Sequence, residues 1–373
     1  MKILLKHVGN MGDLIFLLPP VLESLKHTYP DCHITLVTAW GFKETAWKIN
    51  WHELRKMSRA APLRSLWQRG VARRAKWGKR NQSGFCISLM ASNPHIDQLV
   101  HWHDTRLSLD AAICQEEGIS YPTWNQAYFA SQKKSGHYDL VSELDMGITQ
   151  QENPLGKIYA AVGLPQATYS NYKIYFTPRD REVAQHVVAS WPKPRIILLE
   201  GLEGRTTRGW DEGKIPGLSA AIQKKYNVEP RWFGARFQPR HQGLPLTLRQ
   251  NIATLALCDA AIGVLSGPLH FAAAAGLPTI TLLADQYIHR AAPAYFLNPY
   301  ISHEAKKHRT LLGPSNTHKQ FLKHDEPSHN LTLREAASQH SSGWLSPGRQ
   351  STKTPLATIT VEEVMTVLQD VLD

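Results

Sequence analysis

The sequence predicts an α/β protein with two units, each containing a doubly wound parallel sheet. Each half of the 373-residue chain alternates short apolar runs with stretches of helical length, the order that βαβ units require. In each half, one apolar run also leads through a glycine-containing turn into a helical stretch, at residues 9–13 and at residues 265–267. Turns of this kind lie at the carboxyl ends of parallel strands, where α/β proteins bind ligands.

The first half begins with a strand, a helix and a second strand, expected over residues 2–8, 14–28 and 33–38. Pro19 and Pro20 lie inside that helix and are expected to kink it or to restart it. Further strands or short buried segments are expected at residues 85–90, 98–102 and 138–144. Residues 165–175 have the composition of a linker.

The second half repeats this order without obvious repetition of sequence. Helices are expected over residues 178–190, 215–226 and 248–258, and strands over residues 195–199, 228–233, 260–264 and 279–283. A polar tract rich in His, Ser, Asn and Pro, residues 300–353, is interpreted as a long ordered loop or a partly mobile segment. The last helix is amphipathic and expected over residues 360–372, with Glu362 and Glu363 in its first turn.

The net charge of +11, from 42 Lys and Arg against 31 Asp and Glu, favours anionic partners. Nucleotides, phosphorylated glycolipids and membrane surfaces fit this charge, whereas no recognisable nucleic-acid-binding module supports a nucleic-acid partner. The four cysteines form no CxxC pair, which indicates a cytoplasmic protein without a disulfide framework. No apolar run is long enough to span a membrane, and the histidines lack the spacing of a metal site.

Residues 52–80 are strongly basic, and Glu53 is their one acid. A helix over this stretch would carry Arg69, Arg73 and Lys76 on one face and apolar side chains on another. Such a stretch fits contact with an anionic membrane surface. The alternative is a solvated surface helix whose apolar stripe packs on its own domain.

The segment around Ser266 carries the clearest chemical signal. Ser266 occupies a helix N-cap position, and Gly267 and Pro268 follow in the first turn of an alanine-rich helix. A helix that starts in this way presents free backbone N–H groups and the positive end of its dipole to an anion. Gly267 would let a phosphate approach the backbone, and His270 lies one turn into the helix. The alternative is an ordinary helix cap in an α/β protein.

Four blocks, in order along the chain, resemble the family 9 glycosyltransferases, which include the lipopolysaccharide heptosyltransferases. They are residues 2–13 with Pro19, residues 204–210 with Lys214, residues 266–274 with Pro278, and residues 360–364. The resemblance spans nearly the whole chain, although residues 40–135 and 300–355 match poorly. It implies the GT-B fold, in which two Rossmann-like domains with doubly wound parallel sheets face each other across a central cleft.

The resemblance also implies a division of the chain into an acceptor domain (1–168), a nucleotide-sugar domain (178–355) and a final helix (360–373) that packs back on the N-terminal domain. It places the catalytic base of an inverting transfer at Asp13, in an acceptor-side loop with Asn10, Met11 and Gly12. A carboxylate there would take the proton of the acceptor hydroxyl, while the alternative is that Asp13 only caps the helix. The donor diphosphate would be bound, without a metal or other cofactor, by Arg205, Thr206, Thr207, Arg208, Ser266, Gly267, Pro268 and His270.

Two departures from the family pattern concern the donor. Leu265 replaces the usual acid before Ser266, and no glutamate follows Gly234, where one is expected near the ribose; Glu200 is the nearest substitute.

The leading prediction is an inverting glycosyltransferase that moves a sugar onto an anionic bacterial surface glycan such as lipopolysaccharide core, at the inner face of the inner membrane. Heptose from ADP-heptose is one candidate donor. Two alternatives stay open: transfer to a protein or a soluble glycan, and a non-catalytic GT-B protein that binds nucleotide or glycan.

Overall fold

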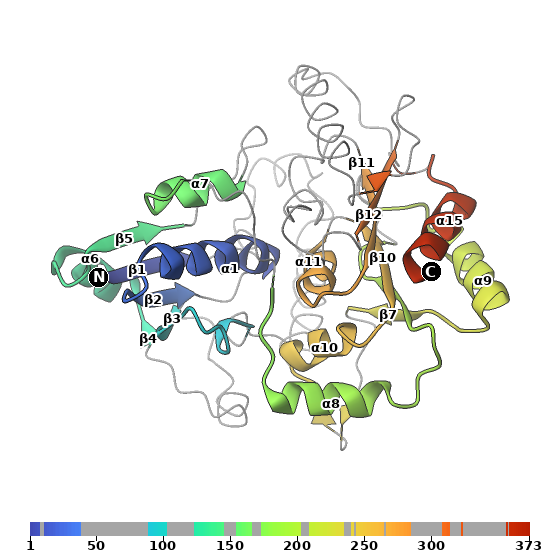
Figure 1. Ribbon diagram of the computed structural model, residues 1–373, viewed down its shortest axis with the longest axis horizontal. Coiled ribbons are helices and arrows are strands. Elements are labelled where there is room, and N and C mark those ends of the chain that lie inside the picture. The colour runs from blue at the N-terminus through green and yellow to red at the C-terminus, as the bar shows by residue number, and fades with distance from the viewer. Residues whose placement is uncertain are drawn as a thin grey trace, which may run out of the picture.

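The computed structural model describes the residues in the ranges 1–7, 11–38, 89–102, 123–144, 154–165, 173–202, 209–234, 240–241, 244–264, 266–284, 308–313, 322–323, 356 and 358–373. Within these ranges the chain forms two principal sheets, each covered by helices (Figure 1). We call each sheet with its helices a unit. The predicted α/β class with two parallel sheets is confirmed.

The first sheet is parallel, with strand order β4-β3-β2-β1-β5. Its strands are β1 (Lys2–His7), β2 (His33–Thr38), β3 (Gln98–Trp102), β4 (Thr123–Trp124) and β5 (Leu140–Glu143). Its helices are α1 (Met11–Thr28), α6 (Gln126–Lys134) and α7 (Pro154–Ala161). Because β2 and β5 lie on opposite sides of β1, the winding reverses at β1, and the loop after this strand begins at the switch point.

The second sheet has the order β13-β12-β11-β10-β6-β7 and is parallel except at β13. Its strands are β6 (Ile196–Leu199), β7 (Arg231–Phe233), β10 (Ala260–Val264), β11 (Thr279–Ala284), β12 (Arg309–Gly313) and β13 (Leu322–Lys323). A separate hairpin pairs β8 (Arg240–His241) with β9 (Leu244–Pro245). The helices are α8 (Pro178–Val188), α9 (Lys214–Tyr226), α10 (Leu248–Leu255), α11 (Gly267–Ala274) and α15 (Val361–Leu372).

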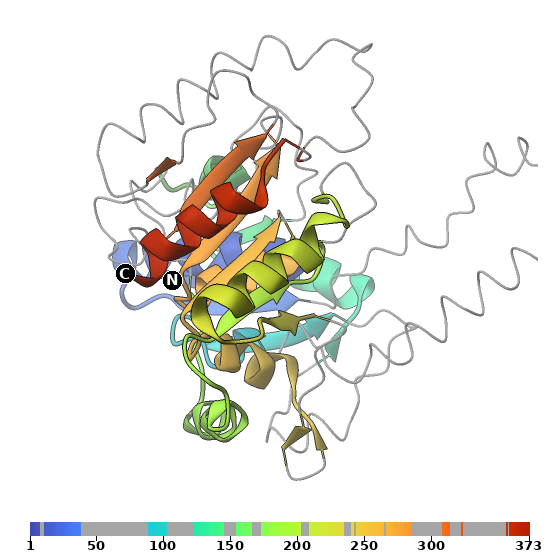
Figure 2. The ribbon, with the colours of Figure 1, turned by 90° about the vertical axis from the view of Figure 1, so that its right-hand side faces the viewer.

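Alternation along the buried strands divides the second unit into two apolar layers. On β6, Ile197 and Leu199 pack toward α10 and α11, whereas Ile196 and Leu198 pack in the cluster that contains α9 and α15. Figure 2 shows α9 and α15 side by side across the face of the sheet that looks away from the first unit. The opposite face, with α11, is the one that meets the first unit (Figure 1).

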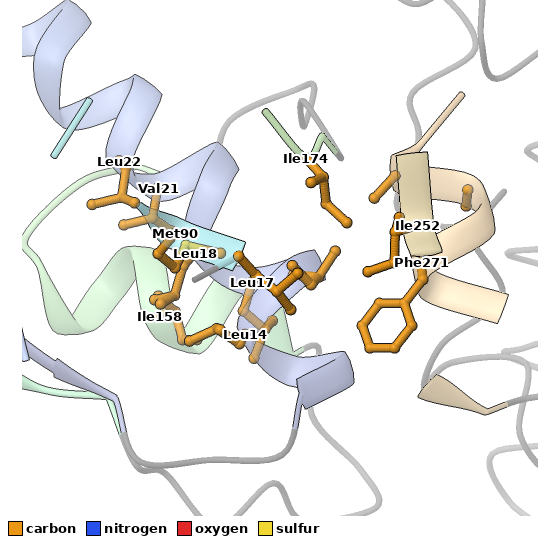
Figure 3. Close-up of a cluster of buried hydrophobic side chains, with 14 of the residues drawn as sticks. Leu14, Leu17, Leu18, Val21, Leu22, Met90, Ile158, Ile174, Ile252 and Phe271 are labelled. Atoms are coloured by element: carbon orange, nitrogen blue, oxygen red, sulfur yellow. The ribbon is translucent and has the colours of Figure 1, made fainter. Parts of the chain in front are cut away.

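Helices α1 and α11 pack together and join the two units through one hydrophobic cluster. Leu14 and Leu17 of α1 and Phe271 of α11 are each at most 4% exposed. Figure 3 shows Ile252 and Phe271 approaching α1 from the second unit. Ile174, in the segment that links the units, donates its backbone N–H to the carbonyl of Ala274 at 3.1 Å. The two units therefore share one core at this contact.

The final helix corrects one expectation, because in the described part of the chain α15 packs on the second unit, whereas the resemblance implied packing on the N-terminal domain. Val364, Val367 and Leu368 are buried among the strands and helix α9 of the second unit. Trp210 Nε1 and Lys214 Nζ both donate to the carbonyl of Ile359, at 3.0 and 2.7 Å, just before the helix starts. The apolar face of the second sheet thus supplies the surface that the amphipathic helix requires.

Other expectations about elements also change. Helix α1 begins at Met11 and continues through Pro19 and Pro20 without ending, although both prolines lack the donor for a helical hydrogen bond. Leu89 and Met90 are helical and buried, so the described end of residues 85–90 is the short buried segment and not the strand of the two alternatives expected there. The polar tract that we interpreted as a loop contains β12 and β13, and Thr310, near the start of β12, is fully buried.

Candidate functional site

The turn between β10 and α11 has the geometry of an anion-binding helix start. Strand β10 is buried along its whole length, and Ser266 adopts an extended N-cap conformation with φ −155° and ψ 166°. The Ser266 hydroxyl oxygen is buried and has no hydrogen-bond partner among the described residues. Because Pro268 lacks an N–H, Gly267 and Leu269 supply the first backbone donors of the helix. Such a turn suits a group rich in acceptors, such as a phosphate.

Two glycines near this turn, Gly263 and Gly267, differ in whether the fold requires the absence of a side chain. A Cβ on Gly263 would lie 2.8 Å from Leu199 Cδ1, so packing between β10 and β6 requires a glycine there. A Cβ on Gly267 would meet no described atom within 4 Å, and Gly267 itself is partly exposed. The fold therefore does not require glycine at position 267. The open space in front of its backbone is what a bound ligand needs.

Glu200 lies at the end of the neighbouring strand β6 and is held between two glycines. Its backbone N–H donates to the carbonyl of Phe233 at 2.8 Å, which extends the pairing of β6 with β7. Its side chain lies across Gly234, where a Cβ would clash with Cβ and Oε2 of Glu200. Gly201 has φ +102°, and a Cβ there would lie 3.5 Å from the Cβ of Ser266. Gly201, the residue after Glu200, thus lies next to Ser266 at the start of α11.

This arrangement lies where α/β folds bind ligands. In the second sheet β7 and β10 flank β6 on opposite sides, so the winding reverses between β6 and β10. The residues at the carboxyl ends of these two strands are Glu200 with Gly201, and Ser266 with Gly267. Packing of α1 against α11 brings the start of α1, at Met11, toward the same region. The structure therefore brings together the starts of the two helices that the sequence analysis assigned to the acceptor side and to the donor side.

Among the predicted donor residues, His270 is buried and uncharged. It is 5% exposed, and burial lowers its pKa to about 3. The imidazole is therefore neutral at physiological pH. Any contribution to phosphate binding must come from a neutral ring and not from a cation.

Several predicted site residues lie outside the described residues. They are Asn10, Arg205, Thr206, Thr207 and Arg208, together with Leu265. The basic stretch 52–80 is also outside them. Met11, Gly12 and Asp13 form the first turn of α1, and only their backbone is described.

Sequence reasoning missed a charged and aromatic cluster on the face of the first sheet that lies opposite to α1. Lys6 Nζ lies 4.4 Å from the ring centroid of Trp102 and 3.2 Å from Glu143 Oε2. Burial raises the pKa of Glu143, but hydrogen bonds from Lys133 and Lys6 outweigh this and hold the pKa below its usual value. Alternating apolar residues around Lys6 could have placed it on a buried face, but its aromatic partners come from separate elements.

Metal and membrane features can be stated for the described part of the chain. No group of three or more His, Cys, Asp or Glu side chains there is arranged to hold a metal ion. No helix among the described residues is both long and apolar enough to cross a membrane.

Comparisons with known proteins identify the fold. No family model matches the chain, and a search of curated proteins found no match. Among solved structures, a family 9 glycosyltransferase from Veillonella parvula DSM 2008 is 14% identical, with 100% of this chain and 97% of that chain covered and a TM-score of 0.51. Escherichia coli ADP-heptose lipopolysaccharide heptosyltransferase II is 14% identical, with 100% and 98% covered and a TM-score of 0.45.

A third solved structure is the iron-containing dodecameric glycosyltransferase TibC from enterotoxigenic E. coli H10407. It is 12% identical, with 99% of this chain and 75% of that chain covered and a TM-score of 0.46. At these identities, the likeness to the Veillonella protein shows a shared fold. The chain therefore has the GT-B class of architecture that the sequence predicted.

The buried His270 predicts a pH dependence of stability. Its pKa is about 3 in the folded chain and near 6.5 when unfolded, so the unfolded state binds the extra proton between these values. The free energy of unfolding then falls as pH falls below 6.5. We measure the free energy of unfolding with urea at pH 7.5 and at pH 5.5. The loss of this free energy between the two pH values should be about 1.4 kcal/mol smaller in His270→Gln than in the wild type. Equal differences in the two proteins would contradict this assignment.

Proposed function

We propose that the chain is an inverting glycosyltransferase that uses a nucleoside-diphosphate sugar. The observation that carries this proposal is the open turn at Gly267, which lies at the switch point of the second sheet and starts a helix packed against α1. The fold shared with a family 9 glycosyltransferase supports it. The four sequence blocks that resemble this family support it as well.

In the proposed reaction, an acceptor hydroxyl oxygen attacks the anomeric carbon of the donor while the bond from that carbon to the diphosphate oxygen breaks. Asp13 takes the hydroxyl proton as general base. The charge that develops on the diphosphate is stabilised by the backbone N–H groups and the dipole at the start of α11. From their sequence positions, Arg205 and Arg208 are assigned to phosphate oxygens, which guanidinium groups bind in a bidentate way. The donor site uses no metal ion.

We assign Glu200 to the ribose of the donor. In nucleotide-binding α/β folds, an acidic residue at the end of the second strand of the first βαβ unit accepts hydrogen bonds from the ribose hydroxyl groups. In this chain that position of β7 is Gly234, and the carboxylate of Glu200 reaches it from β6. A carboxylate accepts hydrogen bonds but repels phosphate, which favours the ribose as its partner.

The sugar and the acceptor follow from the sequence resemblance. ADP-heptose is the first donor to test, and a lipid-linked bacterial surface glycan is the first acceptor. The net charge of +11 and the basic stretch 52–80 favour an anionic acceptor at a membrane surface. Flotation with anionic liposomes distinguishes this acceptor from a protein or a soluble glycan, because only the first requires membrane contact.

A non-catalytic nucleotide-binding protein is the second candidate, and Leu265 favours it. The acid that the family carries at this position is absent here. Nucleotide binding without any transfer or donor hydrolysis would support this second candidate.

The first prediction from this proposal concerns Gly267. We expect the wild type to bind one of ADP, UDP, GDP and CDP in a calorimetric titration. Gly267→Leu should weaken this binding at least about tenfold, because the side chain fills the space in front of the turn. Its thermal midpoint should not fall, since leucine favours a helix more than glycine does. Gly213→Leu makes the same change at the start of α9 and should leave binding unchanged; an equal loss in both variants would count against the site.

A second prediction concerns Glu200. We expect the wild type to bind the preferred nucleotide about ten times more tightly than its 2′-deoxy or 3′-deoxy form, as a charge-assisted hydrogen bond implies. Glu200→Ala should remove most of this preference. Glu229→Ala changes an exposed acid at the opposite end of β7 and should keep it. A preference that survives in Glu200→Ala would show that another group binds the ribose.

A third prediction concerns Asp13. Asp13→Ala should lower the rate of sugar transfer by about 10²-fold or more, because the general base is lost, while nucleotide affinity stays near the wild-type value. The measurement is release of nucleoside diphosphate from the donor in the presence of acceptor. Asp31→Ala, an exposed acid beyond the end of α1, is the matched control. Near-normal turnover in Asp13→Ala would remove this residue from the mechanism.

A further inference from the structure

In both α1 and α11, a residue of the contact between the helices lies four positions after a residue of the proposed site. Leu17 lies four residues after position 13, and Phe271 lies four residues after Gly267. Residues four apart lie on the same face of a helix, one turn of about 5.4 Å apart. In α1 and in α11, the first turn carries the proposed functional position. One turn later, on the same face, Leu17 or Phe271 takes part in the contact between the units.

Both side chains are buried in the cluster that the two units share. Leu17 is 1% exposed and Phe271 is 4% exposed, and both belong to one continuous group of buried residues. Figure 3 shows Leu17 on the side of α1 nearest Ile252 and Phe271, whereas Leu22 lies farther along the helix, away from the second unit. Close-packed interiors transmit displacement, because a buried side chain cannot move without its neighbours.

The far end of α11 is also held. The carbonyl of Ala274 accepts a hydrogen bond of 3.1 Å from the backbone N–H of Ile174, which lies in the segment linking the units. Leu269, between Gly267 and Phe271, is fully buried in the same cluster. Helix α11 is therefore fixed to the first unit and the linking segment along its length, and not only to its own sheet.

We propose that Leu17 and Phe271 are positioning residues that set the distance between the first turn of α1 and the first turn of α11. Through the proposed function, this distance is the one between the general base at position 13 and the diphosphate at Gly267. Displacement of about 1 Å at such a site costs up to about 10²-fold in rate.

The kinetic test compares two truncations in the same helix. Leu17→Ala should lower kcat for sugar transfer at least about tenfold while changing nucleotide affinity less than about threefold, because Leu17 belongs to the other unit. Leu22→Ala is the matched control: Leu22 is fully buried in α1 but packs within the first unit, so it should destabilise the protein and leave kcat unchanged. Leu17→Met, which conserves volume, should restore kcat.

A second test does not depend on activity. Phe271→Ala should speed backbone hydrogen exchange in residues 15–18 of α1, whose N–H groups bond the carbonyls of the first turn, although the substitution lies in the other unit. Leu218→Ala removes a fully buried side chain on the far face of the second sheet and should leave exchange in these residues unchanged.

The outcomes separate the two proposals. Equal kcat in Leu17→Ala and Leu22→Ala, or no change in exchange at residues 15–18 in Phe271→Ala, would overturn the positioning role. A wild-type protein without any transfer activity would overturn the proposed function, and the exchange measurement would then decide the positioning role alone. Faster exchange in Phe271→Ala, but not in Leu218→Ala, supports it.

Discussion

The apolar packing of α1 against α11 is the contact on which the rest of the structure depends. Helix α1 follows β1, at which the first sheet reverses winding, and α11 follows β10, which lies beside the switch point of the second sheet, so each begins at the ligand-binding edge of its sheet. Two sheets with separate cores could adopt many relative orientations. The shared cluster selects one of them, because Leu17 and Phe271 lose their burial if the units part. Burial of a large apolar side chain contributes about 1.5–3 kcal/mol, so several of them at one contact form a substantial barrier to separation.

The βαβ order was predictable because it depends on local periodicity. Buried parallel strands such as β6 and β10 are continuous apolar runs, and the helices between them have apolar stripes. What could not be predicted depends on contacts between distant segments. Helix α1 continues through two prolines, and the carbonyl of Pro20 accepts a hydrogen bond of 3.0 Å from the hydroxyl of Tyr159 in α7. Strand β12 lies in a polar tract, and its pairing with β11 decides its conformation.

The site was predictable to a similar extent. Ser266, Gly267 and Pro268 form the helix start that the sequence indicates, because N-cap, glycine and proline preferences are local. The environment of His270 was not predictable, since its lowered pKa comes from burial by residues elsewhere in the chain. The position of the Glu200 carboxylate likewise depends on the glycine at the end of a different strand. Local preferences thus locate the turn, while its charge and its neighbours come from tertiary packing.

The docking of α15 on the second sheet has a consequence for the order in which the chain folds during synthesis. The described strands of the first sheet are complete by Glu143, so that unit can bury its own strands early. The second sheet must wait, because the face formed by Ile196, Ile262 and Ile280 is covered in part by a helix that starts only at Val361. A nascent chain therefore carries an uncovered apolar sheet while a long polar tract is still being made. Such surfaces are prone to aggregate, so docking of α15 removes an exposed apolar face from the newly made chain.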